Sequence, residues 1–309
     1  MSEKHSKLPK WLARKVEDIL ELDDGELKTL AIRSILEGKI SQSKDSLHEK
    51  DIMLGTDVID EAIALHKAKS SGLRGLSSGF ASIDRLTKGF VKGEVTILSA
   101  RTSVGKTSLA LAISANIAQS GKPVLFMTLE MTQAQLMERY IEYTGGLEDD
   151  FPKDMFMDIA GLTFMQKHEK VTPKSIEGII KNAKEAGAEL VVLDHLHYFS
   201  RGSQTDDVEV ISMELSRTAK KYEIPILAIA HVRKDSVVGG KPKETVIDDI
   251  RGASFISQDA DVVLILNREA DSPTDLRVKV WKNRNGGIDY SKREFTMDMA
   301  GTVIREGWK

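Results

Sequence analysis

Short apolar runs alternate with helical patterns along most of the chain, and this alternation constrains the possible fold more than any other feature. The runs lie at 94–100, 123–130, 189–194 and 225–231, and the helical patterns begin at Lys106 and span 132–144 and 207–223. Runs that are apolar along almost their whole length are typical of parallel strands that helices cover on both faces. The alternation therefore predicts an α/β fold with a mainly parallel sheet flanked by helices.

Strand patterns continue near the C-terminal end without helical patterns between them. They lie at 261–266, 277–282 and 294–299. Strands joined by short connections pair in antiparallel fashion. This part of the sequence therefore predicts an antiparallel edge added to the parallel sheet.

The first 72 residues follow a different pattern. Residues 9–37 carry apolar side chains at helical spacing, and a polar stretch separates them from a capped amphipathic pattern over 56–72. We therefore expect a small helical region, a linker helix and an α/β domain, with the boundaries 1–55, 56–72 and 73–309.

Composition excludes several classes of protein. The chain has 309 residues, 41% of them hydrophobic, which is enough for a sizeable core in one large domain or two smaller ones. It has no cysteine, which excludes disulfides, zinc–thiolate sites and thiol catalysis. Without an apolar run of about 18 residues or a secretory signal, we expect a cytoplasmic protein that does not enter membranes. The net charge of −3 means that a nucleic-acid site would have to be a local basic patch.

A phosphate-binding loop follows the first strand of the α/β region. The stretch "ARTSVGKTS" (100–108) fits the pattern G-x-x-x-x-G-K-[ST], except that Ala100 stands at the first glycine position. Gly105 permits close approach of the backbone to phosphates, Lys106 reaches the β- and γ-phosphates, and the Thr107 hydroxyl is suited to bind Mg²⁺. We therefore expect ATP and Mg²⁺ as cofactors. The nucleotide-binding residues of the loop are then Ser103, Val104, Gly105, Lys106, Thr107 and Ser108.

Three further strand ends carry polar side chains. Asp194 ends an apolar strand and is placed to hold the Mg²⁺ ion together with Thr107. The next residue is His195, so a catalytic base must come from elsewhere, and Glu130 at the end of 123–130 is the candidate. The alternative is that Glu130 merely caps the following helix. His231 ends the strand at 225–231. It is either a structural residue or a sensor of the γ-phosphate, and the second role is possible because the strand ends of such sheets converge on the ligand.

Two cations at the end of the strand "VKVWKNRNGG" (278–287) point to one side. Lys282 and Arg284 are two residues apart, and side chains at that spacing share a face of a strand. In the first alternative they lie on a solvated edge strand. In the second they face one negatively charged target, and because the nucleotide site has its own set of residues, no such target is evident within the chain.

The motifs together resemble the ATPase domain of the DnaB-type replicative hexameric helicases, with some kinship to phage primase-helicases. The resemblance covers most of 73–309 and rests on the stretches "GFASIDRLTKGF", "SARTSVGKTSLAL", "LEMTQAQLMERY", "LVVLDHLH", "DDIRGASFISQDADVVLIL" and "KNRNGG". Alanine at position 100 is usual in that family, whereas Thr102 replaces a common proline and His231 is more similar to the phage group. The short N-terminal region does not resemble the family's N-terminal domain, as would fit a phage or plasmid protein with a reduced N-terminus.

The resemblance implies a RecA-like core that assembles into a homo-hexameric ring around single-stranded DNA. It implies that Glu130 polarises the attacking water, that Arg139 packs near the nucleotide base, and that Lys282 and Arg284 reach the γ-phosphate of the neighbouring subunit as an arginine finger. It also implies a helicase loader and a primase as possible partners, in the nucleoid or, for a phage protein, in the host cytoplasm. The candidates for contact with the DNA are Arg251, Gly252 and Ser254, with Arg233, Lys234, Lys241 and Lys243 as added cations.

Three functions remain open on the sequence. The first is an ATP-hydrolysing ring helicase with the 5′-to-3′ polarity that the family implies. The second is a DNA-stimulated ATPase of recombination or repair that does not unwind, and the third is a nucleotide-binding ring that acts as a scaffold or regulator. Glu130, Arg251 and the Lys282/Arg284 pair favour the first.

Overall fold

The computed structural model describes most of the α/β region and little of the chain before it. The described residues are 63, 72–128, 130–144, 162–166, 172–196, 206–232, 237–238, 241–242, 245–250, 258–268, 275–284, 294–300 and 303–306. The chain divides into two compact units, Met1–Ser70 and Ser71–Lys309. The helices predicted before residue 72 lie outside the described residues, apart from Ile63, which is helical.

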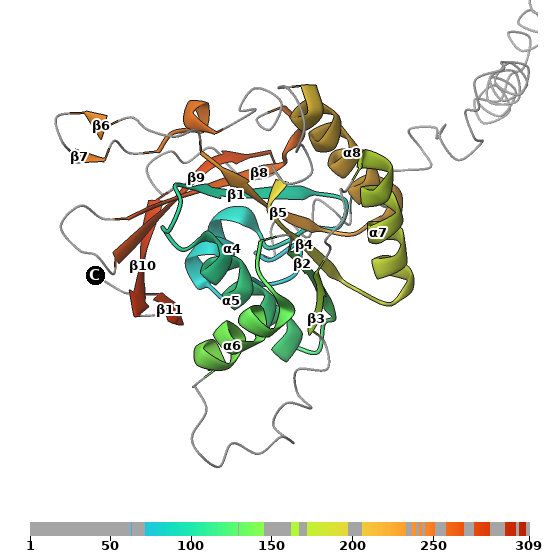
Figure 1. Ribbon diagram of the computed structural model, residues 1–309, viewed down its shortest axis with the longest axis horizontal. Helices are drawn as coiled ribbons and strands as arrows, with labels where there is room; N and C mark the ends of the chain where they lie inside the picture. The colour runs from blue at the N-terminus through green and yellow to red at the C-terminus, as the bar shows by residue number, and fades with distance from the viewer. Residues whose placement is uncertain are drawn as a thin grey trace, which may run out of the picture. The chain divides into compact units, whose positions relative to one another are not determined.

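A sheet of nine strands forms the centre of the second unit (Figure 1). Its strands are β1 (Val95–Ala100), β2 (Val124–Thr128), β3 (Leu162–Gln166), β4 (Leu190–Asp194), β5 (Ile226–His231), β8 (Val262–Arg268), β9 (Asp275–Asn283), β10 (Glu294–Ala300) and β11 (Val303–Glu306). Their order is β11-β10-β9-β8-β1-β5-β4-β2-β3. The pairs from β8 to β3 are parallel, and β9, β10 and β11 add an antiparallel edge. The predicted fold class is therefore confirmed, with β3 and β11 as strands that the sequence analysis did not identify.

Helices cover both faces of the sheet (Figure 1). The bounds are α4 (Ala81–Thr87), α5 (Lys106–Gln119), α6 (Gln133–Thr144), α7 (Pro173–Glu185) and α8 (Asp206–Tyr222), and a 3₁₀ turn spans Ile247–Asp249. The first three helices pack on one face and α7 and α8 pack on the other. β4 shows why the strands are apolar throughout, since Val192 packs into the first core and Val191 into the second. No helix within the described ranges is long and apolar enough to cross a membrane.

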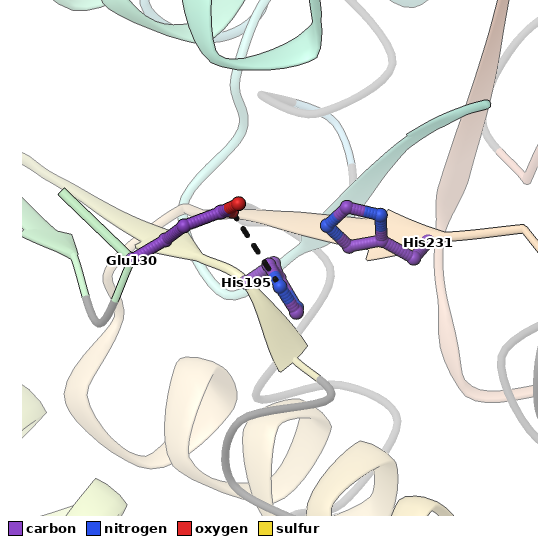
Figure 2. A group of neighbouring side chains, drawn as sticks. All are labelled: Glu130, His195 and His231. Carbon is purple, nitrogen blue, oxygen red and sulfur yellow. Dashed lines mark ion pairs between the residues drawn. The ribbon is translucent and has the colours of Figure 1, made fainter. Parts of the chain in front are cut away.

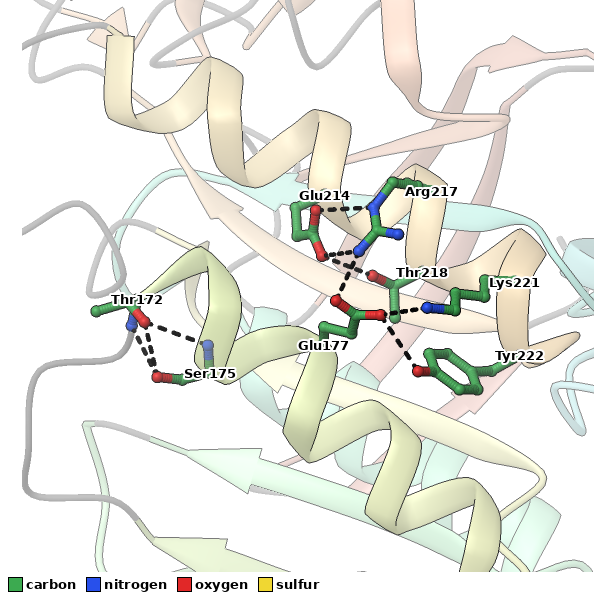
Figure 3. A network of polar contacts seen from close by, with 8 residues as sticks. All are labelled: Thr172, Ser175, Glu177, Glu214, Arg217, Thr218, Lys221 and Tyr222. Carbon is green, nitrogen blue, oxygen red and sulfur yellow. Dashed lines mark hydrogen bonds and ion pairs between the residues drawn. The ribbon is translucent and has the colours of Figure 1, made fainter. Parts of the chain in front are cut away.

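A network of ion pairs joins α7 to α8 on the outer side of the second core (Figure 3). The Glu177 carboxylate accepts hydrogen bonds from Lys221 at 2.8 Å, from Arg217 at 2.7 Å and from the Tyr222 hydroxyl at 3.2 Å. The bonds from Lys221 and Arg217 lower the pKa of Glu177 to about 2. The carboxylate therefore stays charged across the physiological pH range and links the two helices there.

The start of α7 is fixed by a reciprocal cap. The Thr172 hydroxyl accepts from the Ser175 backbone N–H, while the Ser175 hydroxyl accepts from the Thr172 N–H (Figure 3). Pro173 at the first helical turn removes a donor that would have no partner in the helix. This cap sets the register in which Glu177 faces α8.

The register of the central strands brings the carboxyl ends of four strands together, three of which carry a polar residue. Ala100 of β1 pairs with His231 of β5, and Thr128 of β2 pairs with Asp194 of β4. Because β5 also pairs with β4, the carboxyl ends of β1, β5, β4 and β2 lie side by side at one end of the sheet. A ligand of a parallel α/β sheet binds outside the carboxyl ends of the strands, at the point where the strand order reverses.

Candidate active site

The loop between β1 and α5 forms one wall of a cavity at the carboxyl ends of the central strands. Gly105 precedes α5 with a φ of 119°, a conformation that glycine adopts without strain, and Ser103 has a φ of 63°. The cavity has a volume of about 410 Å³. It is lined by Thr102, Ser103, Gly105, Lys106, Thr107, Ser108, Glu130, Met131, Arg139 and His231. The predicted phosphate loop and four side chains from other elements, those of Glu130, Met131, Arg139 and His231, therefore face the same space.

Lys106 is held inside the loop. Its ammonium group donates to the carbonyl oxygens of Ala100 and Arg101, both at 2.9 Å, and the residue is 5% exposed. Burial lowers the pKa of Lys106 to about 8, although the charges of Asp194 and Glu130 act in the opposite direction. A phosphate group beside this amine would supply the negative charge that favours its protonated form.

Thr107 and Asp194 form a pair of oxygen donors next to Lys106. The Thr107 hydroxyl donates to Oδ2 of Asp194 at 2.8 Å, and Asp194 is 2% exposed. Burial raises the pKa of Asp194 to about 6, and the charge of Glu130 raises it further. The Thr107 hydrogen bond and the cations Lys106 and Arg139 lower it. A hydroxyl and a carboxylate are hard oxygen ligands, so this pair fits a hard divalent cation.

Glu130 lies beyond its strand and not at the strand end. The sequence predicted a strand over 123–130, but β2 ends at Thr128 because the Thr128 hydroxyl accepts from the backbone N–H groups of Glu130 and Met131 and turns the chain. The side chain of Glu130 is 48% exposed and lines the cavity.

The alternative role of Glu130 as a helix cap is wrong. Thr132 caps α6, because its hydroxyl accepts from the Gln135 N–H at 3.2 Å and the Gln135 side chain accepts from the Thr132 N–H at 2.9 Å. This reciprocal cap satisfies the start of the helix without the Glu130 side chain. The Glu130 carboxylate therefore lies in the cavity, where it is available for chemistry.

Two histidines lie beside Glu130 (Figure 2). Nε2 of His195 is 3.7 Å from Oε2 of Glu130, and the rings of His195 and His231 meet edge to face with centroids 3.8 Å apart. The peptide bond between Asp194 and His195 is cis. The sequence analysis did not assign His195 to the site, although its place directly after Asp194 at a strand end was a usable signal.

Arg268 is a further residue of the site that the sequence analysis missed. It ends β8, and its guanidinium donates to the carbonyl oxygens of Ser103 and Val104 at 3.4 and 3.3 Å. The signal was again a charged residue at the carboxyl end of a parallel strand. These bonds support the phosphate loop from the side opposite to β5.

Lys282 and Arg284 lie at the other end of the sheet. Lys282 donates to the carbonyl oxygens of Gln258 and Ala260, and Arg284 donates to the Gln258 oxygen at 3.0 Å. Arg284 also forms an ion pair with the buried Asp261 at 3.0 Å, so the expectation that the pair has no partner within the chain is wrong. The two cations do reach toward one shared acceptor, as their spacing predicted.

The position of Asp261 fixes which end of the sheet this is. Its carboxylate accepts from the backbone N–H of Val95, the first residue of β1, at 2.9 Å. The phosphate loop follows the last residue of β1, Ala100, so the six residues of β1, about 17 Å, separate the two places. Lys282 and Arg284 therefore do not contribute to the cavity of their own chain.

The predicted contacts with nucleic acid lie outside the described residues. This holds for Arg233, Lys234, Lys243, Arg251, Gly252 and Ser254. Lys241 belongs to the short strand β7 (Lys241–Pro242), which pairs with β6 (Val237–Val238), but its side chain is not described. Arg139 lines the cavity from α6, and its predicted packing near a nucleotide base stays a prediction.

Residues 75–301 match the model of the DnaB-like helicase C-terminal domain family. The chain is 28% identical over 289 residues to the replicative DNA helicase DnaB of Geobacillus stearothermophilus, an alignment that covers 84% of this chain and 62% of that protein. It is 27% identical over 307 residues to a probable plasmid replicative DNA helicase of Chlamydia trachomatis, with 93% and 67% covered. The chain thus spans about three fifths of the length of the first relative.

Two solved structures share the fold. One is a separately solved ATPase domain, which superposes with a TM-score of 0.69 at 20% identity and covers 81% of this chain and 99% of that one. The other is a DnaB-like replicative helicase, solved in a study of its interactions with primase, which superposes with a TM-score of 0.65 at 18% identity and covers 96% and 76%. At these identities the likeness concerns the fold.

Proposed function

The chain belongs to the DnaB-like helicase C-terminal domain family, and we propose that it is the motor of a ring-shaped replicative helicase that hydrolyses ATP and moves along single-stranded DNA. The observation that carries this proposal is the cavity that Lys106, Thr107, Glu130 and His231 share, with Asp194 bonded to Thr107 beside it. A residue for phosphate, a pair for a divalent cation and a candidate base are the parts that hydrolysis of a nucleoside triphosphate requires.

In this proposal the loop and Lys106 hold the β- and γ-phosphates of ATP, and Thr107 and Asp194 hold Mg²⁺. When bound, Mg²⁺ supplies charge neutralisation to the phosphates. Lys106 must exchange its bonds with the Ala100 and Arg101 carbonyls for phosphate oxygens, and its burial makes that exchange favourable.

Glu130 is proposed to orient the attacking water and accept its proton. Its carboxylate lines the cavity from the turn after β2 and carries no role in capping α6. His231 ends β5 in the same cavity, between the loop after β1 and the end of β4, where its ring nitrogens can contact the γ-phosphate. Through the loss of that contact, the release of the γ-phosphate after hydrolysis would be transmitted to the segment that follows β5.

Lys282 and Arg284 are proposed to complete the site of a neighbouring subunit. The length of β1 separates them from the phosphate loop of their own chain, so a role in catalysis requires a second copy of the chain. This arrangement makes the homo-oligomer part of the active site, and six copies are the number that the family implies. Stabilisation of transition-state charge by such a finger is worth about 10³–10⁵ in rate.

Contacts with single-stranded DNA are proposed for the segment around Arg251, with Gly252 and Ser254, and for cations of the segment 233–243. Phosphate contacts of this kind give binding without sequence preference that weakens with salt. A loader and a primase are proposed as partners of the full assembly. In that role the protein works on DNA in the cytoplasm, in the nucleoid or in a phage-infected host.

Hydrolysis and unwinding can be tested on the same preparation. ATPase activity is measured with and without single-stranded DNA, and strand displacement is measured on forked DNA with ATP. Lys106→Ala is expected to abolish both activities, whereas Lys122→Ala, which removes an exposed cation paired with Glu189 at the far end of β2, is the matched control. ATPase activity that survives in Lys106→Ala would refute the assignment of the nucleotide site. DNA-stimulated hydrolysis without strand displacement would favour the recombination-type alternative.

A further inference from the structure

Glu130, His195 and His231 form a cluster of potential metal ligands, and metal binding by the three together is a separate property from the roles proposed for Glu130 and His231 in nucleotide hydrolysis. One ligand atom from each residue lies within 4.8 Å of the other two, and the Glu130–His195 pair is already at 3.7 Å. The three side chains converge from the turn after β2 and from the ends of β4 and β5 (Figure 2). We propose that these residues form a binding site for a divalent transition-metal ion, with Zn²⁺ as the cation that fits best.

The spacing of the ligand atoms suits such an ion after a small movement. Bonds from zinc to nitrogen or oxygen of about 2.0–2.1 Å place the ligands of a tetrahedral site about 3.4 Å apart. Two of the three ligands are rings at the ends of paired strands, and their positions are set by the sheet. Glu130 lies in a turn with its side chain half exposed, so it can close the remaining distance by rotation about its side-chain bonds.

The ligand types separate this site from the pair formed by Thr107 and Asp194. Two imidazole nitrogens and one carboxylate favour Zn²⁺, Co²⁺, Ni²⁺ or Cu²⁺, whereas Mg²⁺ prefers an all-oxygen environment. Thr107 and Asp194 offer oxygen only. The two sites lie next to each other, because His195 follows Asp194 directly, yet their ligands select different classes of cation.

Three protein ligands leave further coordination positions around the ion. Because Glu130 and His231 both line the cavity, water or a phosphate oxygen in the cavity can occupy those positions. Binding of the ion would occupy the carboxylate of Glu130. If Glu130 orients water as proposed above, the ion is a reversible inhibitor of hydrolysis. This last consequence depends on the proposed function, whereas the binding site itself does not.

Binding can be measured without nucleotide on the full-length chain without an affinity tag, with Co²⁺ as a coloured substitute for Zn²⁺. The chain is expected to bind Co²⁺ with the visible absorption of a low-coordinate nitrogen and oxygen site, and Zn²⁺ but not excess Mg²⁺ should displace it. His231→Ala and Glu130→Gln should each weaken binding by more than the about 10–100-fold typical of residues that only support a ligand. Glu189→Gln is the matched control for Glu130→Gln, because it removes a carboxylate that pairs with Lys122 directly before β4, at the end of the strand opposite to His195, and it should bind as the wild type does.

A second variant keeps the test decisive if the alanine variant is unstable. The chain has no cysteine, so His231→Cys introduces a single thiol at one ligand position. If residue 231 binds the ion, the Co²⁺ complex of this variant acquires a sulfur-to-cobalt charge-transfer band in the near ultraviolet, and Zn²⁺ removes it. Wild-type affinity in His231→Ala, displacement by Mg²⁺, or a folded His231→Cys variant without that band would each overturn the site. Because no nucleotide is present, none of these outcomes depends on whether the protein is a helicase.

Discussion

The proposed sharing of the active site between subunits makes a quantitative prediction for mixed assemblies. Arg284 is anchored by Asp261 at the start of β1, about 17 Å from the end at which the phosphate loop begins. It can therefore act only on a neighbour. Arg284→Ala should lose about 10³–10⁵ in the rate of hydrolysis, or about 4–7 kcal/mol of transition-state stabilisation. Glu130→Gln should lose activity as well, since it removes the candidate base.

The mixture of the two inactive variants should regain activity. In the proposed ring, each interface takes Glu130 from one subunit and Arg284 from the next. In a ring assembled at random from equal amounts of the two variants, about one quarter of the interfaces combine an intact Glu130 with an intact Arg284. Hydrolysis should therefore rise from background to about one quarter of the wild-type rate if interfaces act independently. A finger that acted within its own chain would give no rise at all.

The assay is steady-state ATPase activity after subunit exchange, with native mass spectrometry to establish that mixed rings have formed. Arg277→Ala is the matched control because Arg277 is a half-buried cation on the same strand β9, and this variant should keep wild-type activity alone. Mixed rings whose activity stays at background would refute the reasoning. Unchanged activity of Arg284→Ala alone would also refute it and would favour the solvated-edge alternative.

Three further predictions concern stability, each measured by urea unfolding without added nucleotide. Burial raises the pKa of Asp194 from 3.8 to about 6, so the native state binds this proton more tightly than the unfolded chain does. Stability is therefore lost as the pH rises from about 4 to about 6, and the full cost of the charged form is present above about pH 6. Asp194→Asn should therefore raise the unfolding free energy at pH 7 by on the order of 2 kcal/mol and change little below about pH 4, and equal stability at pH 7 would contradict this. Asp261→Asn should lower it by about 1–3 kcal/mol, because one charge-assisted bond of a buried carboxylate is lost, while Asp259→Asn should have little effect. Thr172→Ala should lower it by about 1 kcal/mol through loss of the cap of α7, and Thr172→Ser should restore most of that loss.

Apolar periodicity predicted the strands that form the buried centre of the sheet and missed elements whose pattern is short. β1, β2, β4, β5 and β8 are continuous apolar runs because cores cover both faces, so they could be recognised in the sequence. β11 has four residues and α4 has seven, which is too short for a period to be read. β3 has five residues, as β2 and β4 do, but its sequence LTFMQ is not a continuous apolar run, because it contains Thr163 and Gln166. The sequence analysis did not identify α7, although Ile176, Ile179 and Ile180 form an apolar stripe at helical spacing and Thr172 with Pro173 forms a start signal.

Much of the candidate site could be predicted because of one rule about parallel sheets. Lys106 and Thr107 were assigned from the phosphate-loop motif and Asp194 from its place at the end of a strand, and the structure brings the three together at one end of the sheet. Contacts across long separations could not be predicted in the same way. Arg268 reaches a loop 164 residues earlier, and Arg284 finds Asp261 through the register of β9 against β8, which no local pattern encodes.

Burial disfavours the charged forms of both Lys106 and Asp194, so the residues suited to bind phosphate and cation lower the stability of the folded chain when no ligand is bound. The pKa of Lys106 is lowered to about 8 and that of Asp194 is raised to about 6, so the attraction between the two does not offset their loss of solvation. Each group gains most from a further opposite charge: a phosphate for Lys106 and a divalent cation for Asp194. Nucleotide and cation binding would therefore stabilise the folded chain, as any ligand specific to the native state does. Asp194→Asn should separate stability from activity, because the substitution that is expected to stabilise this end of the sheet also removes the carboxylate that is proposed to hold the cation for hydrolysis.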